Sequence, residues 1–200
     1  MDYLPEQIAG VDEVGRGALF GPVVAAAVIL SDTAAQTLVH HGMTDSKRLS
    51  PQRRLALTDQ IHGLATAFQV GFASAYEIDR LNILQASLLA MRRSVLRLPL
   101  TPQFCLVDGN QRIPHLPMEH KTVVKGDLSE PAISAASILA KVWRDQLIVR
   151  LDRRYPGYDL ASNKGYGSVK HRQALQDLGP TRQHRLSFAP CRIEARRCLD

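Results

Sequence analysis

Residues 8–30 read IAGVDEVGRGALFGPVVAAAVIL, and this stretch decides the fold. Two runs rich in valine, isoleucine and alanine, residues 8–14 and 23–30, have the length and composition of β-strands. The segment between them holds glycines at positions 15, 17 and 21, which suit a turn of the backbone. We therefore predict that the chain begins with a hairpin or a meander of buried strands.

The segments that follow indicate a mixed α/β domain. Helix start and stop signals flank several of them, such as Ser50-Pro51 before one segment and Gly179-Pro180 after another. Further strands are expected at residues 66–75, 104–107 and 121–125, and helices at residues 51–65, 78–98, 131–154, 168–178 and 194–199. Strands come early and helices late, so the fold class is α/β with a helical C-terminal part. At 200 residues the chain fits a single domain, 1–200, in which residues 143–200 form a basic helical C-terminal extension.

The charge of the chain is unevenly distributed. Lysine and arginine number 25 against 19 aspartate and glutamate residues, which gives a net charge of +6. Residues 141–200 carry 13 basic and 6 acidic side chains, a net charge of +7, whereas residues 1–140 carry a net charge of −1. A basic segment on a near-neutral body favours a polyanionic partner such as nucleic acid, and a solvated basic surface is the alternative.

Cysteine spacing and hydropathy point to the cytoplasm. The cysteines at positions 105, 191 and 198 show no C-x-x-C spacing, so neither a zinc site nor a disulfide framework is predicted. Residues 1–8 hold no apolar signal core, and the longest apolar run, residues 23–30, is too short to span a bilayer. We expect a cytoplasmic protein that does not associate with membranes.

Acidic side chains beside glycine end three of the predicted strands. Asp12 and Glu13 lie near the end of the first strand, Asp108 ends a later one, and Asp127 follows the last. Acids that meet at one edge of a sheet repel one another unless a cation neutralises them, and hard carboxylate ligands suit Mg²⁺ or Mn²⁺. Such sites serve two-metal phosphoryl transfer. In the alternative interpretation Asp108 and Asp127 belong to ordinary turns, while Asp12 and Glu13 point to opposite faces of their strand.

Two glycine-rich segments suggest contacts with a sugar-phosphate backbone. Gly15, Arg16 and Gly17 lack the spacing and the following helix of a dinucleotide-binding fingerprint, so we reject that site. They suit a turn that brings backbone and a guanidinium close to a sugar-phosphate, or a plain strand turn with an exposed arginine. Lys164 and Tyr166 lie just before a helix in the basic region, where they would hold phosphate and stack on a base or sugar. A turn with the tyrosine packed on the core is the alternative.

The remaining polar segments receive structural or surface roles. Residues 44–50 form a polar loop that is expected to cap the following helix rather than to bind phosphate. His171 and His184 lie in the basic C-terminal part, where phosphate contact or surface placement is expected rather than catalysis.

Together these segments resemble the bacterial ribonuclease HII family. In the order of the family the chain carries D-E-V-G-R-G at 12–17, G-P-V-V-A-A at 21–26, D-S-K-R-L-S at 45–50, V-D-G-N at 107–110, V-K-G-D at 124–127, I-S-A-A-S-I-L-A-K-V at 133–142, K-G-Y-G at 164–167 and H-R-L-S-F at 184–188. The resemblance implies a ribonuclease H-like mixed sheet flanked by helices, with a helical C-terminal extension. It also implies an endonuclease that cuts the RNA strand of RNA–DNA hybrids and nicks duplex DNA beside embedded ribonucleotides.

The resemblance further implies roles for individual residues. The family's metal-site acids, which bind Mn²⁺ or Mg²⁺, fall on Asp12, Glu13, Asp108 and Asp127. Its Gly-Arg-Gly element, which reads the ribose 2′-hydroxyl, falls on residues 15–17, and its stacking tyrosine falls on Tyr166. Lys47 matches a phosphate-side lysine. Asp145 matches a recurrent acid, for which we expect an ion pair with Arg144.

These observations predict a monomeric, Mg²⁺- or Mn²⁺-dependent endoribonuclease. The resemblance implies that water attacks the phosphorus on the 5′ side of a ribonucleotide, which would leave a 3′-hydroxyl and a 5′-phosphate. Basic residues of the C-terminal part are expected to attract the phosphate backbone, among them Lys164, Lys170, Arg172 and Arg185. A replication or repair protein is a further candidate partner, through basic residues 191–199. Two alternatives stay open: a non-catalytic protein that binds hybrids or DNA, and another nuclease of the same fold, such as a junction resolvase.

Overall fold

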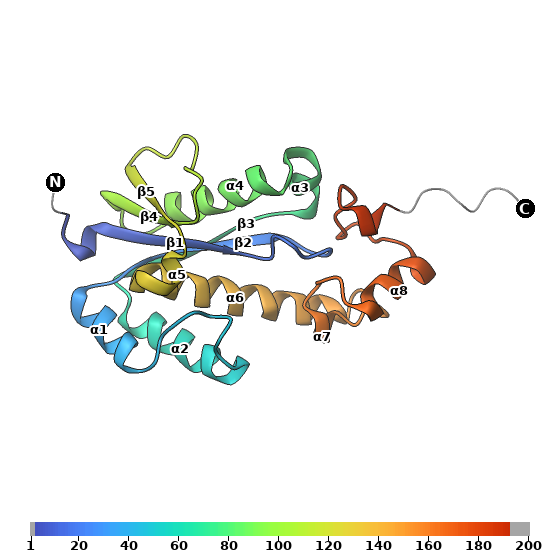
Figure 1. Ribbon diagram of the computed structural model, residues 1–200, viewed down its shortest axis with the longest axis horizontal. Helices are drawn as coiled ribbons and strands as arrows, with labels where there is room; N and C mark the ends of the chain where they lie inside the picture. The colour runs from blue at the N-terminus through green and yellow to red at the C-terminus, as the bar shows by residue number, and fades with distance from the viewer. Residues whose placement is uncertain (1–2, 193–200) are drawn as a thin grey trace, which may run out of the picture.

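The computed structural model describes residues 3–192, and within them five strands form one mixed sheet in the order β3-β2-β1-β4-β5 (Figure 1). The strands are β1 (Ile8–Val14), β2 (Val23–Ile29), β3 (Ala67–Ala73), β4 (Phe104–Asp108) and β5 (Glu119–Val123). β1 pairs antiparallel with β2, and β2 with β3, which confirms the predicted N-terminal meander. β1 also pairs in parallel with β4, and β4 with β5, so β1 is the central strand.

Helices cover both faces of this sheet. α3 (Ala75–Leu81) and α4 (Ile83–Leu96) pack on one face, and α6 (Pro131–Asp152) packs on the other, together with α1 (Asp32–His40) and α2 (Pro51–Leu64) (Figure 1). Alternate residues of β2 therefore enter two cores: Ala25 and Ala27 face the α4 side, whereas Val24 and Ala26 face the α6 side. Gly10 lets α6 approach β1 closely, because a Cβ at this position would lie 2.2 Å from the backbone of Ala132.

Several element boundaries differ from the prediction. The single helix expected at residues 78–98 is wrong, because Asn82 adopts a φ of +70°, ends α3 and caps α4 with its side chain. α1 was not predicted, although Ser31 caps it. The strand expected at 121–125 runs instead from Glu119 to Val123. The short helix expected at residues 194–199 lies outside the described residues.

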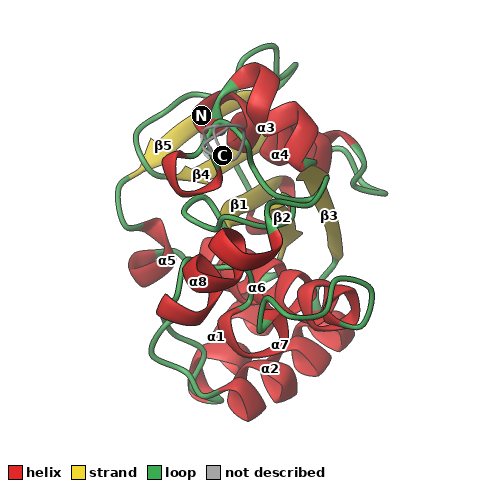
Figure 2. Cartoon of the chain, turned by 90° about the vertical axis from the view of Figure 1, so that its right-hand side faces the viewer, coloured by secondary structure: helices red, strands yellow, loops and turns green. Residues whose placement is uncertain are grey.

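The C-terminal part builds onto the far end of α6, beyond the sheet. α6 continues past the sheet edge, and α7 (Leu160–Asn163), α8 (Val169–Leu178) and the 3-10 turn Ala189–Cys191 gather around it (Figures 1 and 2). The loop between β1 and β2 reaches this part: Ala18 forms an isolated β-bridge with Tyr166, and Phe20 forms one with His184. Early and late segments of the chain thus meet at the loop that follows β1.

His171 and His184 lie inside this junction, so their expected surface placement is wrong. Both residues are buried, and their Nε2 atoms lie 3.1 Å apart. Ring packing against Phe20 and Tyr158 completes their surroundings. Across residues 3–192, no helix is long and apolar enough to cross a bilayer.

Candidate active site

Asp12 and Glu13 sit at the C-terminal end of β1, and both side chains line one cavity of about 390 Å³. Asp12 is 6% exposed, accepts a 2.7 Å hydrogen bond from the backbone N–H of Glu13 and is bonded by Ser137 of α6. Glu13 instead accepts from the Arg16 guanidinium at 3.2 Å. Neighbouring strand residues point to opposite faces, and both acids nevertheless line this cavity. The pairing of β1 with β4 ends at Val11, so this side of β1 is open beside the two acids.

Asp108 and Asp127 approach from the neighbouring segments. Asp108 is the last residue of β4, and its Oδ1 accepts a 2.8 Å hydrogen bond from the N–H of Gly126. The expectation that Asp127 directly ends a strand is wrong: Lys125, with a φ of +57°, turns the chain after β5 into the short helix α5 (Gly126–Ser129). Asp127 is buried in the first turn of α5, where the helix start favours a carboxylate.

Burial and mutual repulsion raise the pKa values of three of these acids. Burial, and then the charges of Glu13 and Asp108, raise the pKa of Asp12 well above its usual range. Burial and the charge of Asp127 raise the pKa of Asp108. Burial also raises the pKa of Glu13, against the opposing effect of Arg16. This corner of the molecule therefore concentrates more negative charge than its own side chains neutralise.

That donor set fits a hard divalent cation. Carboxylate oxygens are the ligands that Mg²⁺ and Mn²⁺ prefer, and a cation would relieve the repulsion that raises these pKa values. In the arrangement that residues 3–192 adopt, no three histidine, cysteine, aspartate or glutamate side chains are close enough together to hold a metal ion. The carboxylate oxygens suit the cation chemically, but in this structure they lie too far apart to coordinate it together.

Lys47 places a positively charged side chain at the rim of the site. Its side chain is 81% exposed, and Nζ lies 3.7 Å from Asp127 Oδ2. Burial acts to lower the pKa of Lys47, but the nearby carboxylates, Asp127 foremost, outweigh it and raise that pKa. The predicted capping role of this loop is confirmed, since Ser50 Oγ accepts from the N–H of Arg53. The same loop thus caps α2 and delivers a lysine to the acids.

The Gly15–Gly17 turn forms another wall. Gly15 has a φ of +88°, and a Cβ there would lie 2.2 Å from Arg144 Nε, so both conformation and space require glycine. Arg16 is half exposed and is held over the site by Glu13. At Gly17 a Cβ would meet nothing within 4 Å, so this position is open to a ligand.

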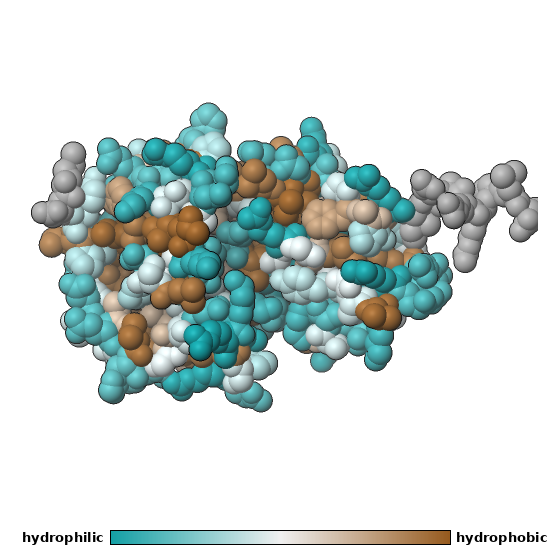
Figure 3. Space-filling view, in the orientation of Figure 1, coloured by the Kyte–Doolittle hydropathy of each residue, from teal (hydrophilic) through white to brown (hydrophobic). Residues whose placement is uncertain are grey.

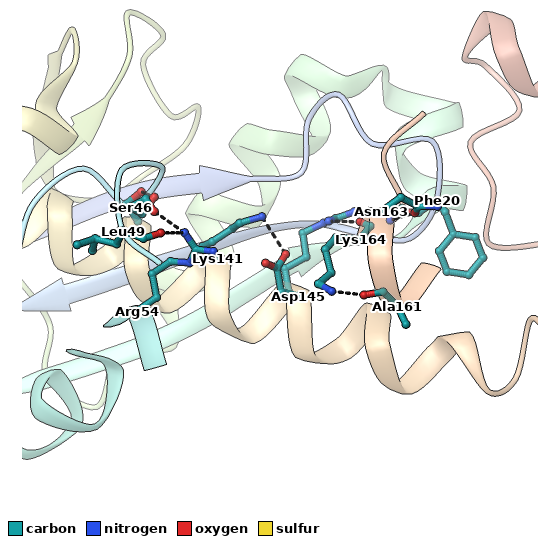
Figure 4. A network of polar contacts seen from close by, with 12 residues as sticks. Phe20, Ser46, Leu49, Arg54, Lys141, Asp145, Ala161, Asn163 and Lys164 are labelled. Carbon is teal, nitrogen blue, oxygen red and sulfur yellow. Dashed lines mark hydrogen bonds and ion pairs between the residues drawn. The ribbon is translucent and has the colours of Figure 1, made fainter. Parts of the chain in front are cut away.

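Tyr166 faces the cavity from the C-terminal part. Its ring centroid lies 5.4 Å from Arg144 Cζ and 5.6 Å from Lys141 Nζ, and the residue lines the same cavity as the acids. Lys164 lies elsewhere: it lines a groove of about 720 Å³ between α2, α6 and α7, where the surface is hollowed (Figure 3). Its Nζ donates to the carbonyl of Ala161, as Figure 4 shows.

Sequence reasoning missed three residues that line the acid cavity: Ser46, Ser137 and Lys141. The Ser46 and Ser137 hydroxyls lie 2.9 Å apart, which fixes the loop before α2 against α6. Lys141 Nζ donates to Asp145 Oδ1 at 3.0 Å, so the ion pair expected between Asp145 and Arg144 is wrong (Figure 4). The signal was present, because residues 137, 141 and 145 repeat at the spacing of one helix face.

Arg185 also departs from expectation. It was assigned to phosphate attraction, but its side chain is fully buried and donates to backbone carbonyls of the loop after β1. Lys170 and Arg172 of α8 are exposed, as expected of residues that attract a polyanion.

Comparison with known proteins places this arrangement in a family. The family model described as Ribonuclease HII matches residues 9–191. The chain is 80% identical over 191 residues to the Ribonuclease HII of Acaryochloris marina (strain MBIC 11017), covering 96% of each protein. It is 61% identical over 183 residues to the Ribonuclease HII of Trichodesmium erythraeum (strain IMS101), covering 92% of this chain and 87% of that protein.

Solved structures agree in fold. The ribonuclease H2 of Pyrococcus horikoshii OT3 matches with a TM-score of 0.78 at 26% identity, over 92% of this chain and 95% of that one. The PCNA:RNase HII complex of Archaeoglobus fulgidus matches with a TM-score of 0.71 at 29% identity, over 85% of both chains. The structure of Bst-RNase HIII in complex with Mn²⁺ matches with a TM-score of 0.78 at 20% identity, over 94% of this chain and 69% of that one. These matches confirm the ribonuclease H-like mixed sheet, and the extent of the family model shows that the chain belongs to the ribonuclease HII family of endoribonucleases.

Proposed function

We propose that this endoribonuclease of RNA–DNA hybrids also nicks duplex DNA at single embedded ribonucleotides, cutting on their 5′ side to leave a 3′-hydroxyl and a 5′-phosphate. One observation carries the proposal: the acids at the ends of β1 and β4 share a cavity with Gly15 and Arg16 and with Tyr166. Chemistry at phosphorus and recognition of a sugar are thus supported within one site.

Asp12, Glu13, Asp108 and Asp127 would hold Mg²⁺ or Mn²⁺ in this site. When bound, such cations neutralise the acids, lower the pKa of the attacking water and stabilise the charge that builds up on the phosphate. The chain's own contribution is to hold these acids partly desolvated and close together, and a bound cation would offset the burial and the repulsion that raise the pKa values of Asp12 and Asp108. The Mn²⁺ complex of Bst-RNase HIII agrees with this choice of cation.

The Gly15–Gly17 turn and Tyr166 would recognise the ribonucleotide. The open space at Gly17 leaves room for a ribose, and Arg16 stands beside it while bonded to Glu13. The turn that reads the 2′-hydroxyl is thereby linked to one of the acids. Tyr166 would stack on the neighbouring sugar or base, and Lys47 would contact phosphate at the rim.

The rest of the chain would attract and hold the duplex. We assign residues 143–200 to a basic helical extension of a single domain, with Lys164, Lys170 and Arg172 contributing positive charge. A monomer in the cytoplasm, and recruitment by a replication or repair protein, stay predictions. The PCNA complex of the archaeal relative supports the last of these.

One assay tests the proposal. The full chain is incubated with Mg²⁺ or Mn²⁺ and a DNA duplex that carries one ribonucleotide, and the nick is mapped at nucleotide resolution, with the Asp12→Asn variant as the matched control. A single metal-dependent nick 5′ of the ribonucleotide is the expected result. Tight binding without a nick would favour the non-catalytic alternative, and cleavage of a branched all-DNA junction would favour a resolvase.

A further inference from the structure

Two fully buried guanidinium groups lie behind the wall that faces the substrate. Arg144 of α6 and Arg185 of the C-terminal segment are each 0% exposed. Within residues 3–192, neither forms an ion pair with a carboxylate. Burying an unpaired charge costs several kcal/mol, on the order of the stability of a whole domain, unless polar groups replace its water. These two arginines therefore need a specific set of acceptors.

Backbone carbonyls supply those acceptors. Arg185 donates to Gly15 O and Arg16 O, each at 2.7 Å, and to Gly21 O at 3.0 Å. Every nitrogen of its guanidinium thus has an oxygen partner. All three acceptors belong to the loop of residues 15–22, which contains the proposed ribose-reading turn.

Arg144 repeats the arrangement from the other side. It donates to Phe20 O at 3.0 Å, to Pro22 O at 3.1 Å and to Lys164 O at 2.8 Å. Its guanidinium also lies 5.4 Å from the ring centroid of Tyr166. One side chain therefore contacts both the loop after β1 and the turn that carries the proposed stacking residue.

This bonding makes the loop conformation and the buried charges depend on one another. If the carbonyls of residues 15–22 turned away, two neighbouring cations would lose their acceptors in an apolar surrounding. The positions are also sterically tight, since a Cβ at Gly165 would lie 2.8 Å from Phe20 O. Burial and the charge of Arg144 lower the pKa of Arg185 to about 9, which agrees with two cations held close together in a dry environment.

We propose that Arg144 and Arg185 are positioning residues for ribose recognition: together they hold the Gly15–Gly17 turn and the Tyr166 turn in the arrangement that discriminates a ribonucleotide from a deoxyribonucleotide. This inference rests on the proposed function. The two arginines do not touch the substrate, and they act through the carbonyl groups that they bind.

The test uses Arg185→Lys and Arg144→Lys, which keep the positive charge but lack the planar guanidinium that donates to three carbonyls at once. Two quantities are measured in Mg²⁺: KM for a duplex with one ribonucleotide, and Ki for the same duplex in all-DNA form as a competitor. We expect KM to rise about tenfold, the effect of losing one buried hydrogen bond to a charged group, with Ki within about twofold of the wild-type value. General structural damage would lower the active fraction and kcat, and would leave the ratio of Ki to KM unchanged.

Arg93→Lys is the matched control. Arg93 is a part-buried arginine of α4 that bonds Glu77 and the carbonyl of Phe72, and its hydrogen bonds include none of the carbonyls of residues 15–22. Its replacement should lower the melting temperature and leave kcat, KM and Ki as in the wild type. If Arg185→Lys and Arg144→Lys match this control, the positioning role is wrong. If the wild type itself makes no nick at the ribonucleotide, the proposed function fails, and this inference fails with it.

A measurement on the wild type can overturn the proposal even if the lysine variants do not fold. The amides of Leu19, Phe20 and Gly21 donate to carbonyls of residues 165 and 183. A clamped loop predicts that these amides exchange with deuterium as slowly as those of β1. Exchange within the range typical of open loops would overturn the proposal.

Discussion

Acid should destabilise this protein through one pair of buried histidines. The N–H of Thr181 lies 2.9 Å from His184 Nδ1, and an amide can only donate, so Nδ1 is the acceptor and the proton sits on Nε2. His184 Nε2 then donates to His171 Nε2 at 3.1 Å, and His171 Nδ1 donates to the carbonyl of Tyr166 at 2.9 Å. This chain of hydrogen bonds works only when both rings are neutral. A further proton would place two N–H groups opposite each other, with no acceptor between them.

The magnitude follows from the pKa of His184. Burial, and then the proximity of His171, lower that pKa from 6.5 to about 4. Between these values the unfolded chain binds a proton that the folded chain does not, so acid favours unfolding. The contribution is fully present above pH 6.5. Linkage gives a loss of about 2 kcal/mol by pH 5 and about 3 kcal/mol by pH 4.

Denaturant unfolding of the wild type and of His184→Gln at pH 7.5, 6 and 5 measures this loss. At pH 7.5 the variant should be less stable than the wild type, because it loses the ring contacts with Phe20 and Tyr158. Glutamine stays neutral, so the variant should lose about 2 kcal/mol less than the wild type on going to pH 5. His40→Gln, at an exposed position, should follow the wild type. Parallel stability curves for the wild type and His184→Gln between pH 7.5 and 5 would refute the reasoning.

Three further predictions concern the site. Asp12→Asn should keep or raise the free energy of unfolding, because it removes a charge whose burial and carboxylate neighbours raise the pKa, and should abolish cleavage; retained cutting at saturating metal would contradict the assignment of this acid. Arg16→Ala should reduce the preference for a ribonucleotide duplex over the all-DNA duplex in competition binding, and an unchanged preference would exclude a part for Arg16 in reading the ribose. Binding of the duplex should weaken with salt by roughly 0.7–0.9 log units per log unit of salt for each phosphate contact. Lys170→Ala should reduce that slope by about one contact, and a flat response in the wild type would leave the C-terminal charge without a role in binding.

Local pattern was enough to predict the parts of the site that lie on strands. The apolar runs around Asp12 and before Asp108 placed Asp12 near the end of one strand and Asp108 at the end of another, and the structure has them there. The approach of Asp127 was harder to foresee. It depends on the left-handed conformation of Lys125 and on a four-residue helix too short to give a periodic signal.

The burial of polar residues in the C-terminal part could not be predicted from the sequence for a different reason. Arg144 and Arg185 raise the count of basic residues in the C-terminal part, and His171 and His184 lie in the same part, yet all four are buried. Composition counts charges without showing which groups solvate them. The carbonyls of residues 15–22 that bind the two arginines, and the Phe20 ring that packs against His184, are distant in sequence, and such contacts leave no trace in local periodicity. The break at Asn82 likewise depends on one backbone angle inside an apparently continuous helical pattern.

The bond from Arg185 to the carbonyl of Gly15 spans 170 residues and has a consequence for the order in which the enzyme matures. A ribosome completes all four acids by residue 127, well before it delivers the segment that fixes the turn beside them. Contacts of such large sequence separation form late in folding, because closing a long loop is entropically costly. The acids that would hold the cation are therefore synthesised before the arginine that holds the turn beside them. We expect this turn to be among the last parts of the site to order.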